Sequence, residues 1–296
     1  MNYNGTVFYI IAFFSKLSTI FYKEGKNMKL RDRFWLWGHP EGRYNNNIDG
    51  YGCPHFSRMT PMEGCLYLGI SNTFMVPVNW PVNRRQYNKS FKTLNKVGWE
   101  FFRKMETPEV IEDYINEAKE FPNINCVVFD DFKGNMHKHD LNALEENLKK
   151  VMDRIHNNDV KRLDSWMVLY TREFGIKEEE DIAFQPIMDT FDGIIMWNWF
   201  ESQYKEIPDK FEIFKKLTPK NRRMFGCYLY NFGERKQATG EAVKWQLDFY
   251  REKILAGEAE GIVLHTNTMA DLDYEAYDAC LEWMSEHGDE EVPALD

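Results

Sequence analysis

The sequence has no long apolar run near its start and fewer basic than acidic residues. The N-terminal apolar run, residues 7–14, is eight residues long, whereas a helix needs about 20 apolar residues to cross a bilayer. Lysine and arginine number 37 against 47 aspartates and glutamates, which leaves a formal net charge of −10. Because such a field repels polyanions and anionic lipid, we expect neither a nucleic acid nor a membrane as partner.

Cysteine is also scarce. The five cysteines are Cys53, Cys65, Cys126, Cys227 and Cys280, and none belongs to a Cys-x-x-Cys pair. Their odd number and wide spacing exclude a disulfide framework and a zinc knuckle. Two of them, Cys126 and Cys227, lie inside apolar runs, where a free cysteine acts as a small core residue. A reducing compartment is the simpler interpretation, so we expect a cytoplasmic protein.

Glycine-rich motifs and flexible linkers are missing as well. No phosphate-binding loop or dinucleotide fingerprint occurs, and Gly38 and Gly42 alone do not make one. We therefore expect no cofactor and disfavour phosphorylated substrates. No stretch rich in Pro, Gly or Ser divides the chain, which predicts one domain over residues 28–296.

Residues 1–27 are predicted to lie outside this domain. A signal peptide fits them poorly, because the apolar run lacks a basic start and is followed by Ser15, Lys16 and Leu17 rather than by a small-x-small cleavage site. The residues Lys23, Glu24 and Gly25 can be encoded by a purine-rich ribosome-binding stretch. Met28 follows at a suitable distance, so we expect it to be the true start.

Short apolar or aromatic runs recur along the rest of the chain, each followed by a polar turn and an amphipathic segment. Their spacing is about the length of one strand, one helix and two loops, which indicates a repeated βα unit. The eight runs are residues 34–38, 73–76, 97–101, 125–129, 166–170, 193–197, 224–228 and 261–265.

The helices between these runs are predicted from their capping residues and apolar stripes. One is expected to open at Thr107 and Pro108, another at Asp140, and two more to cover residues 239–256 and 273–286. Residues 83–95 are too polar to show a clear stripe. Eight strands alternating with helices favour a single (β/α)8 TIM barrel over a doubly wound open sheet, which more usually has five or six strands.

The ends of the predicted strands are polar and aromatic. In a TIM barrel the chemistry lies at the carboxyl ends of the strands, and sugar rings pack on aromatic faces while their hydroxyls bind polar groups. Trp80 and Trp199 are the preferred stacking residues, although single tryptophans also serve as core. The expected substrate-binding residues are His39, Asn79, Trp80, Tyr170, Arg172, Asn198, Trp199, Tyr230, Asn231, His265 and Asn267.

Two adjacent carboxylates, Asp130 and Asp131, follow the fourth run directly. Because side chains alternate along a strand, we expect one to face the barrel axis and the other a loop or neighbouring strand. The inward one can act as acid, base or nucleophile, although an aspartate here can also simply cap the next loop.

Glycoside hydrolysis needs a second carboxyl group across the scissile bond. Glu173 is the preferred partner for the aspartates, Glu201 is the reserve and Glu41 a distant third. A salt bridge to Arg172 or a helix N-terminal charge is an equally good interpretation of Glu173. A position in the first turn of a helix is the simpler interpretation of Glu201.

Metal chemistry is the main alternative. His39, His137, His139 and His265 lie near strand ends, and His137 and His139 form a His-x-His pair. In barrel metallohydrolases such a pair usually closes the first strand, whereas this one lies several residues past the fourth. We therefore predict no metal site, while a metal-dependent sugar isomerase or hydrolase and a non-catalytic sugar-binding barrel stay open as alternatives.

Several segments carry a family resemblance. They are residues 38–42 (GHPEG), 58–69 (RMTPMEGCLYLG), 127–132 (VVFDDF), 260–263 (EGIV) and 271–272 (DL). Together they are similar to a family of bacterial TIM-barrel proteins related to glycoside hydrolases, over nearly everything after Met28. The resemblance implies the barrel fold and a carbohydrate substrate. It implies no mechanism, because the Asn-Glu pair of one large glycosidase clan and the chitinase Asp-x-x-Asp-x-Asp-x-Glu pattern are both absent.

Overall fold

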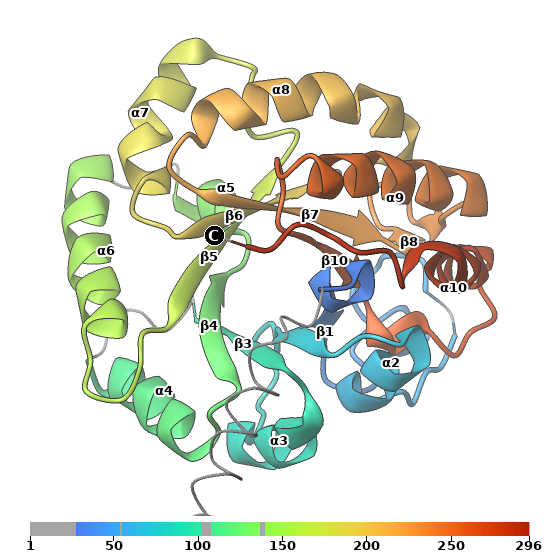
Figure 1. Cartoon of the computed structure of the whole chain (residues 1–296), viewed down its shortest axis with the longest axis horizontal. Coiled ribbons are helices and arrows are strands. Elements are labelled where there is room, and N and C mark those ends of the chain that lie inside the picture. Colours follow the sequence, from blue (N-terminus) through green and yellow to red (C-terminus); the bar gives the residue numbers. More distant parts are fainter. Residues whose placement is uncertain (1–27, 54, 102–107, 137–139, 296) are drawn as a thin grey trace, which may run out of the picture.

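The computed structural model describes residues 28–53, 55–101, 108–136 and 140–295. Eight parallel strands close into a barrel in the order β1-β10-β7-β6-β5-β4-β3-β2, and the helices form a ring outside it (Figure 1). The predicted (β/α)8 TIM barrel is confirmed, with the eighth strand closing on the first. The expectation for residues 1–27 falls outside the described residues.

The barrel strands coincide closely with the apolar runs of the sequence. The runs at 34–38, 193–197 and 261–265 match their strands at both ends, and each of the other five strands begins one or two residues before its run. A small antiparallel pair, β8 (Tyr230–Asn231) and β9 (Lys236–Gln237), lies between β7 and the next helix, outside the barrel. The barrel strands are β1 (Phe34–Gly38), β2 (Asn72–Met75), β3 (Lys96–Glu100), β4 (Ile124–Phe129), β5 (Asp164–Tyr170), β6 (Gly193–Trp197), β7 (Arg222–Tyr228) and β10 (Gly261–His265).

Capping residues begin the helices where the sequence predicts them. Asp140 caps α6 by accepting hydrogen bonds from the amides of Asn142 and Ala143, and the hydroxyl of Thr239 caps α9. The helices are α2 (Pro61–Leu68), α3 (Arg84–Ser90), α4 (Pro108–Glu120), α5 (Phe132–Met136), α6 (Leu141–His156), α7 (Glu178–Met188), α8 (Ile207–Leu217), α9 (Gly240–Leu255) and α10 (Glu275–His287), with 3-10 turns η1 (Leu30–Arg33), η2 (Asn45–Asn47), η3 (Phe91–Thr93), η5 (Glu201–Glu206) and η6 (Asn267–Met269).

The polar segment 83–95 does form a helix, α3, followed by η3. Its inner face is partly polar: Tyr87 packs against the rings of Phe91 and Trp99, and the one fully buried side chain is an asparagine. Asn88 is buried there, accepts a hydrogen bond from the indole N–H of Trp99 at 2.9 Å, and donates to Glu117 at 3.0 Å. Because α3 is held by these hydrogen bonds and by a single aromatic residue, its sequence shows no apolar stripe. Among the described residues, no helix combines the length and the apolar character needed to cross a bilayer.

The barrel interior is packed by alternate residues of each strand. Two tryptophans on one strand each lie over a glycine on the next strand. Only glycine fits at these two positions, because a side chain there would collide with the indole ring. A Cβ on Gly193 would lie 2.2 Å from the Trp166 ring, and one on Gly226 would lie 1.9 Å from the Trp197 ring. Cys126 and Cys227 are buried and free, as expected, Cys126 among the inward residues and Cys227 among the outward ones.

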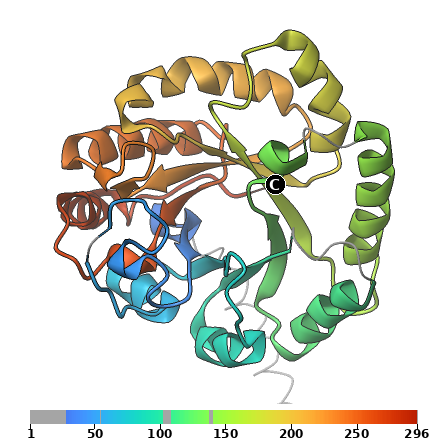
Figure 2. The same cartoon turned by 180° about the vertical axis from the view of Figure 1, so that it is seen from behind.

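The two ends of the barrel differ. At the amino-terminal end the last residues of the chain run across the strand starts (Figure 1), where Lys29 pairs with Glu291 and the amide of Val292 donates to Met28 at 2.9 Å. At the other end the long loop 39–60 and the short helix α5 lie in front (Figure 2). The carboxyl ends of the strands open on this second face, where TIM barrels carry their sites.

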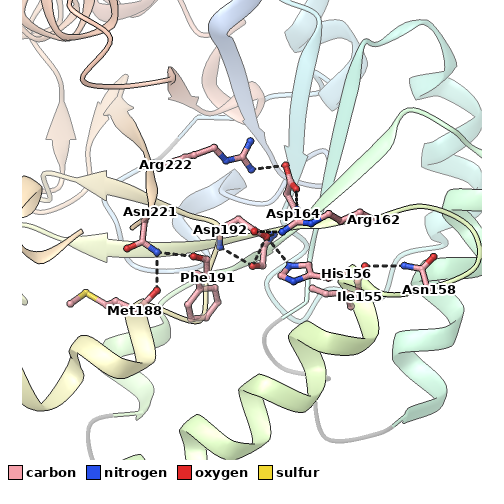
Figure 3. Close-up of polar contacts among 11 residues, drawn as sticks. Ile155, His156, Asn158, Arg162, Asp164, Met188, Phe191, Asp192, Asn221 and Arg222 are labelled. Atoms are coloured by element: carbon pink, nitrogen blue, oxygen red, sulfur yellow. Dashed lines mark hydrogen bonds and ion pairs between the residues drawn. The ribbon is translucent and has the colours of Figure 1, made fainter. Parts of the chain in front are cut away.

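A network of charged and polar residues ties α6, β5 and β6 together at the amino-terminal end (Figure 3). Asp192 precedes β6, and its Oδ2 accepts hydrogen bonds from Nε2 of His156 and the amide of Ser165, both at 2.8 Å. Its other oxygen is ion-paired with Arg162, which also pairs with Asp164. Burial raises the pKa of Asp192, but the hydrogen bonds from His156, Arg162 and Ser165 outweigh it and hold the pKa below its ordinary value.

Replacing Asp192 by asparagine should destabilise the fold in a pH-dependent way. At pH 7 we expect the free energy of unfolding to fall by about 1–3 kcal/mol, because buried donors lose a charged acceptor. A carboxyl whose folded pKa is lowered stabilises the fold fully above its unfolded pKa of about 3.9, and loses that contribution as the pH falls toward the folded value. The difference between wild type and variant should therefore shrink below about pH 4.

Denaturant unfolding at pH 7, 5 and 3 measures this effect. The exposed Asp159, changed to asparagine, is the matched control and should leave stability nearly unchanged. A difference for Asp192→Asn that stays constant from pH 7 to 3 would show that its charge contributes nothing.

Candidate active site

A cavity of about 190 Å³ opens at the carboxyl ends of the strands. It is smaller than the roughly 300–1,000 Å³ of pockets for drug-sized ligands, which suits a ligand portion of about one ring. Its walls combine carboxylates, phenols, imidazoles, guanidinium groups and indole rings. The lining residues are Trp37, His39, Arg43, Tyr44, Tyr51, Val78, Asp130, Asp131, Tyr170, Arg172, Trp197, Trp199, Tyr228, Phe232 and His265.

Both adjacent aspartates border this cavity. Cys126 and Val128 face the barrel interior, so Asp130 continues the inward series of β4. Asp131 departs from strict alternation because its backbone is left-handed, with φ at 50°, a conformation that costs a non-glycine residue free energy and often occurs at functional sites. The hydroxyl of Tyr170, on the neighbouring strand, donates to Oδ1 of Asp131 at 2.8 Å. We expected only one of the two carboxylates to face the barrel axis, but both border the cavity. The expected contact of the other aspartate with a neighbouring strand is confirmed for Asp131.

Four tyrosines of the cavity are held in their neutral form. Burial is the main cause that raises the pKa of Tyr44, Tyr170 and Tyr228 far above the usual range, and the charge of Asp130 raises each further. The half-buried Tyr51 has a raised pKa for the same main reason, with Asp131 adding to it. These phenols therefore act as hydrogen-bond donors at neutral pH.

Tryptophan and phenylalanine rings form the apolar walls. Trp37 and Trp197 meet edge to face with centroids 5.4 Å apart, and Trp197 lies 4.7 Å from the Tyr228 ring. Trp199 contacts Tyr228 at 5.6 Å. The sequence predicts Trp199 as a stacking residue and offers Trp37 and Trp197 as rings that suit a sugar site, but it does not single out Tyr228. Continuing the alternation of β7 to its last residue is the signal that could have identified Tyr228.

Two histidines meet on the wall formed by β1 and β10. Nδ1 of His39 bonds the carbonyl of Val76 at 2.6 Å, and its Nε2 lies 3.2 Å from both Nε2 of His265 and the hydroxyl of Tyr44. Burial lowers the pKa of His39 to about 3, and burial also lowers the pKa of His265 well below its usual value. Since Nδ1 of His39 must donate to the carbonyl, its Nε2 is an acceptor and both rings are neutral.

These histidines do not belong to a recognisable metal centre. Among residues 28–53, 55–101, 108–136 and 140–295, no group of three or more His, Cys, Asp or Glu side chains is arranged to hold a metal ion. The predicted candidates His137 and His139 lie outside the described residues.

Two arginines border the cavity. Arg172, which the sequence predicted, stacks over Tyr170 at 4.8 Å and over Trp199 at 4.7 Å. Arg43, which it did not predict, lies over Tyr44 at 5.3 Å and is ion-paired with Asp49. Both guanidinium groups add positive charge beside the two carboxylates, and both sit against aromatic rings that fix their position.

The two predicted glutamates lie outside the cavity lining. Oε2 of Glu173 accepts a hydrogen bond from the backbone amide of Tyr170 at 3.0 Å, and burial raises its pKa. Glu201 accepts hydrogen bonds from the amide and hydroxyl of Thr239, at 2.9 and 3.2 Å, at the start of α9. Glu173 therefore holds the β5 turn behind the cavity, and Glu201 fastens η5 to α9.

Two predicted substrate-binding residues border a different hollow. Asn79 and Trp80 follow β2 and line a neighbouring cavity of about 330 Å³ together with Trp99 and Glu100. Trp80 is nevertheless linked to the first cavity, because Arg43 lies over its ring at 5.7 Å.

Four other predicted residues support the loops rather than the cavity wall. Asn267 accepts from the amide of His39 at 2.8 Å and donates to its carbonyl at 3.1 Å. The hydroxyl of Tyr230 donates to the carbonyl of Tyr51 at 2.9 Å. Asn198 donates to the carbonyl of Phe200 at 2.7 Å, and Asn231 to Glu234 at 3.0 Å. Two of these residues, Asn267 and Tyr230, thus hold cavity residues in place. Sequence alone could not distinguish this indirect role from direct contact with a ligand.

The fold is shared with solved glycoside hydrolases. No protein-family model and no curated protein matches the sequence. Active domain 2 of the thermostable chitinase from Pyrococcus furiosus, solved with chito-oligosaccharides, is 9% identical with a TM-score of 0.55, covering 92% of this chain and all of that one. The GH5_18 protein from Streptomyces cattleya, solved with GlcNAc, is 12% identical with a TM-score of 0.57, covering 90% and 83%.

A third similar structure is the GH51 arabinofuranosidase from Xanthomonas axonopodis pv. citri, 9% identical with a TM-score of 0.56, covering 93% of this chain and 78% of that one. Identities this low show a common fold alone. The architecture is therefore the barrel on which several glycoside hydrolases are built, and the chemistry has to be argued from the cavity itself.

The packing of the Trp197 ring in the cavity wall can be tested by changing Gly226, which lies against it. Gly226→Ala places a methyl group 1.9 Å from the Trp197 ring, so the ring must move. We expect a loss of about 1–3 kcal/mol in unfolding free energy from overpacking, with a changed tryptophan fluorescence. Met224→Leu, a volume-conserving change on the same strand, should cost less. Unchanged stability and fluorescence in Gly226→Ala would contradict the described packing.

Proposed function

We propose that this protein is a glycoside hydrolase that binds one sugar ring in the cavity and cleaves its glycosidic bond with Asp130 and Asp131. The observation that carries the proposal is the meeting of two adjacent carboxylates with aromatic walls in one cavity at the carboxyl end of the barrel. Carboxyl groups are the acid and base that glycoside hydrolysis requires. Indole and phenol rings supply the apolar faces on which a sugar ring packs.

The other polar groups of the cavity suit sugar hydroxyls. The neutral phenols donate hydrogen bonds, the neutral imidazoles of His39 and His265 accept or donate them, and Arg43 and Arg172 donate only. Solved structures of the same fold include a chitinase with chito-oligosaccharides and a GH5_18 protein with GlcNAc. A carbohydrate ligand is therefore chemically consistent with both the cavity and the fold.

The sequence favoured Glu173 as partner of the aspartates, and the contacts support a different division of roles. The carboxylate of Glu173 is engaged by the backbone of Tyr170 outside the cavity lining. We assign the chemistry to the two aspartates and a supporting role to Glu173, which holds the turn that carries Tyr170. Tyr170 in turn positions Asp131.

Amide substitutions separate these roles. Asp130→Asn and Asp131→Asn should each lower kcat at least about 100-fold, because each removes a group that exchanges or orients a proton in the reaction. Glu173→Gln should lower kcat much less, since an amide oxygen can still accept the Tyr170 hydrogen bond. The measurement is kcat on whichever aryl glycoside is cleaved, together with the melting temperature of each variant.

Glu201→Gln is the matched control, because Glu201 is a carboxylate at the same end of the barrel whose contact with Thr239 is purely structural. It should keep nearly normal kcat. If Glu173→Gln lost as much activity as the aspartate variants while folding normally, the pairing of an aspartate with Glu173 that the sequence suggested would be correct. If both aspartate variants stayed active, the carboxylate mechanism would be wrong.

The aromatic residues give a second test. Trp199 borders the cavity whereas Trp80 borders the neighbouring hollow. Trp199→Ala should weaken sugar binding by about 1–3 kcal/mol, as expected for a central aromatic contact, and Trp80→Ala should have a smaller effect. For both variants, isothermal titration calorimetry with a sugar that the protein binds measures the affinity, and thermal melts measure the stability. A large loss of stability in Trp199→Ala without a change in affinity would assign this ring to packing.

A further inference from the structure

A second cavity lies beside the cavity that holds the two aspartates. It has a volume of about 330 Å³ and is lined by residues that follow β2 or lie at the end of β3. The turn after β2 is a wall of both cavities, because Val78 lines the first while its neighbours Pro77 and Asn79 line the second. Arg43, which lines the first cavity, also lies over the ring of Trp80 in the second, at 5.7 Å. The two cavities are therefore adjacent.

The turn between them is held in a strained conformation. Val78 and Asn79 both have left-handed backbones, with φ at 47° and 66°. Asparagine adopts this conformation fairly readily, whereas for a β-branched residue such as valine it is rare and costly. The side chain of Glu100 stabilises the turn, since its Oε2 accepts a hydrogen bond from the amide of Val78 at 2.9 Å. Strain of this kind persists only where the surroundings fix it, and it is concentrated at functional sites.

Aromatic rings form much of the second cavity. Trp99, Phe101 and Tyr114 are buried in the core, whereas the ring of Trp80 is partly exposed. Sugar rings pack their apolar C–H faces on aromatic faces. Trp80 is the ring that a ligand can cover, because the other three are already covered by the protein.

Polar side chains line the same cavity. The exposed amide of Asn79 can donate and accept hydrogen bonds, the carboxyl oxygens of Glu100 can accept them, and the guanidinium group of Arg84 can donate them. Arg84 is fixed in place, since it stacks over Tyr114 at 4.2 Å and pairs with Glu117 at 3.0 Å. Because donors and acceptors occur together, the cavity suits the hydroxyl groups of a sugar.

We propose that the second cavity binds a second sugar ring of the same substrate, so that the substrate is a disaccharide or a longer carbohydrate. This inference rests on the proposed function. The first cavity, of about 190 Å³, holds about one ring, so the remainder of a longer substrate has to lie outside it. The second cavity is adjacent and lies at the same end of the barrel.

Other hollows of the described chain lie elsewhere. One is formed by residues of α6 and α7 in the outer ring of helices. Two more lie at the amino-terminal end of the barrel, on the opposite face from the aspartates. None of these three shares a wall with the first cavity, so the cavity beside Trp80 is the one that continues it.

Affinity as a function of sugar length tests the inference. The wild-type chain is titrated calorimetrically with methyl glycosides, which have one ring, and with the corresponding sulfur-linked disaccharides, which resist hydrolysis. The series are those of glucose, mannose, xylose, arabinose and N-acetylglucosamine. We expect the second ring to tighten binding at least 10-fold in the series that binds, because it covers Trp80 and meets Asn79. Equal affinity for one ring and for two would overturn this inference and leave the proposed function intact.

Two substitutions locate the second ring. Trp80→Ala removes the stacking face, and Asn79→Gly removes the amide group but keeps the left-handed backbone, which glycine adopts readily. The ratio of two-ring to one-ring affinity should fall at least 5-fold in Trp80→Ala and at least 2-fold in Asn79→Gly. Tyr67→Ala changes an exposed aromatic residue of α2 that lines neither cavity, and as the matched control it should keep the wild-type ratio.

The melting temperature of each variant shows whether it folds. An unchanged ratio in both folded variants would overturn the assignment of the second ring to this cavity, even if disaccharides bound more tightly than single rings. If no sugar of either length bound and no glycoside were cleaved, the proposed function itself would be overturned.

Discussion

The structure depends on one constraint: every second residue of eight strands must fit inside a single closed barrel. The interior is filled because large rings on one strand meet glycine on the next, as Trp166 does over Gly193 and Trp197 over Gly226. Close packing of this kind leaves little freedom to any single ring. Side chains alternate in the same way up to the ends of the strands. There the inward-facing side chains are polar or aromatic instead of aliphatic.

The cavity lies where this packed interior ends, at the carboxyl ends of the strands. Below it lie Trp37 and Trp197, and above them the strand ends add carboxylates, phenols and imidazoles. Burial keeps the tyrosines and histidines neutral, because a charged form would lose its hydration. Charge in the cavity is thereby concentrated on two aspartates and two arginines. The left-handed backbone at Asp131 brings the second carboxylate to the same cavity as the first.

The sequence predicted the fold well, because strand spacing and capping residues are local signals. Asp140 and Thr239 cap helices where expected, and the eight apolar runs are the eight strands. The site was predicted in part. Asp130, Asp131 and Trp199 follow strand ends, His265 ends β10, and all four border the cavity. Asn267 and Tyr230 also follow strand ends, but they bond the loops beside the cavity. Glu173 turns back to its own strand. These differences depend on side-chain direction and on loops that fold over the barrel, and Arg43 and Tyr51 come from such a loop.

The contact between the two ends of the described chain bears on how the barrel assembles. Arg33, at the start of β1, bonds the carbonyl of Pro293, 260 residues away, and β1 completes its pairing only with β10. Contacts at such separation carry the largest loop-closure entropy and slow folding. Strands β2 to β7 pair with their sequence neighbours and can form progressively. Closing the barrel is therefore the natural last step, and the cavity, whose walls include both His39 and His265, exists only once that step is complete.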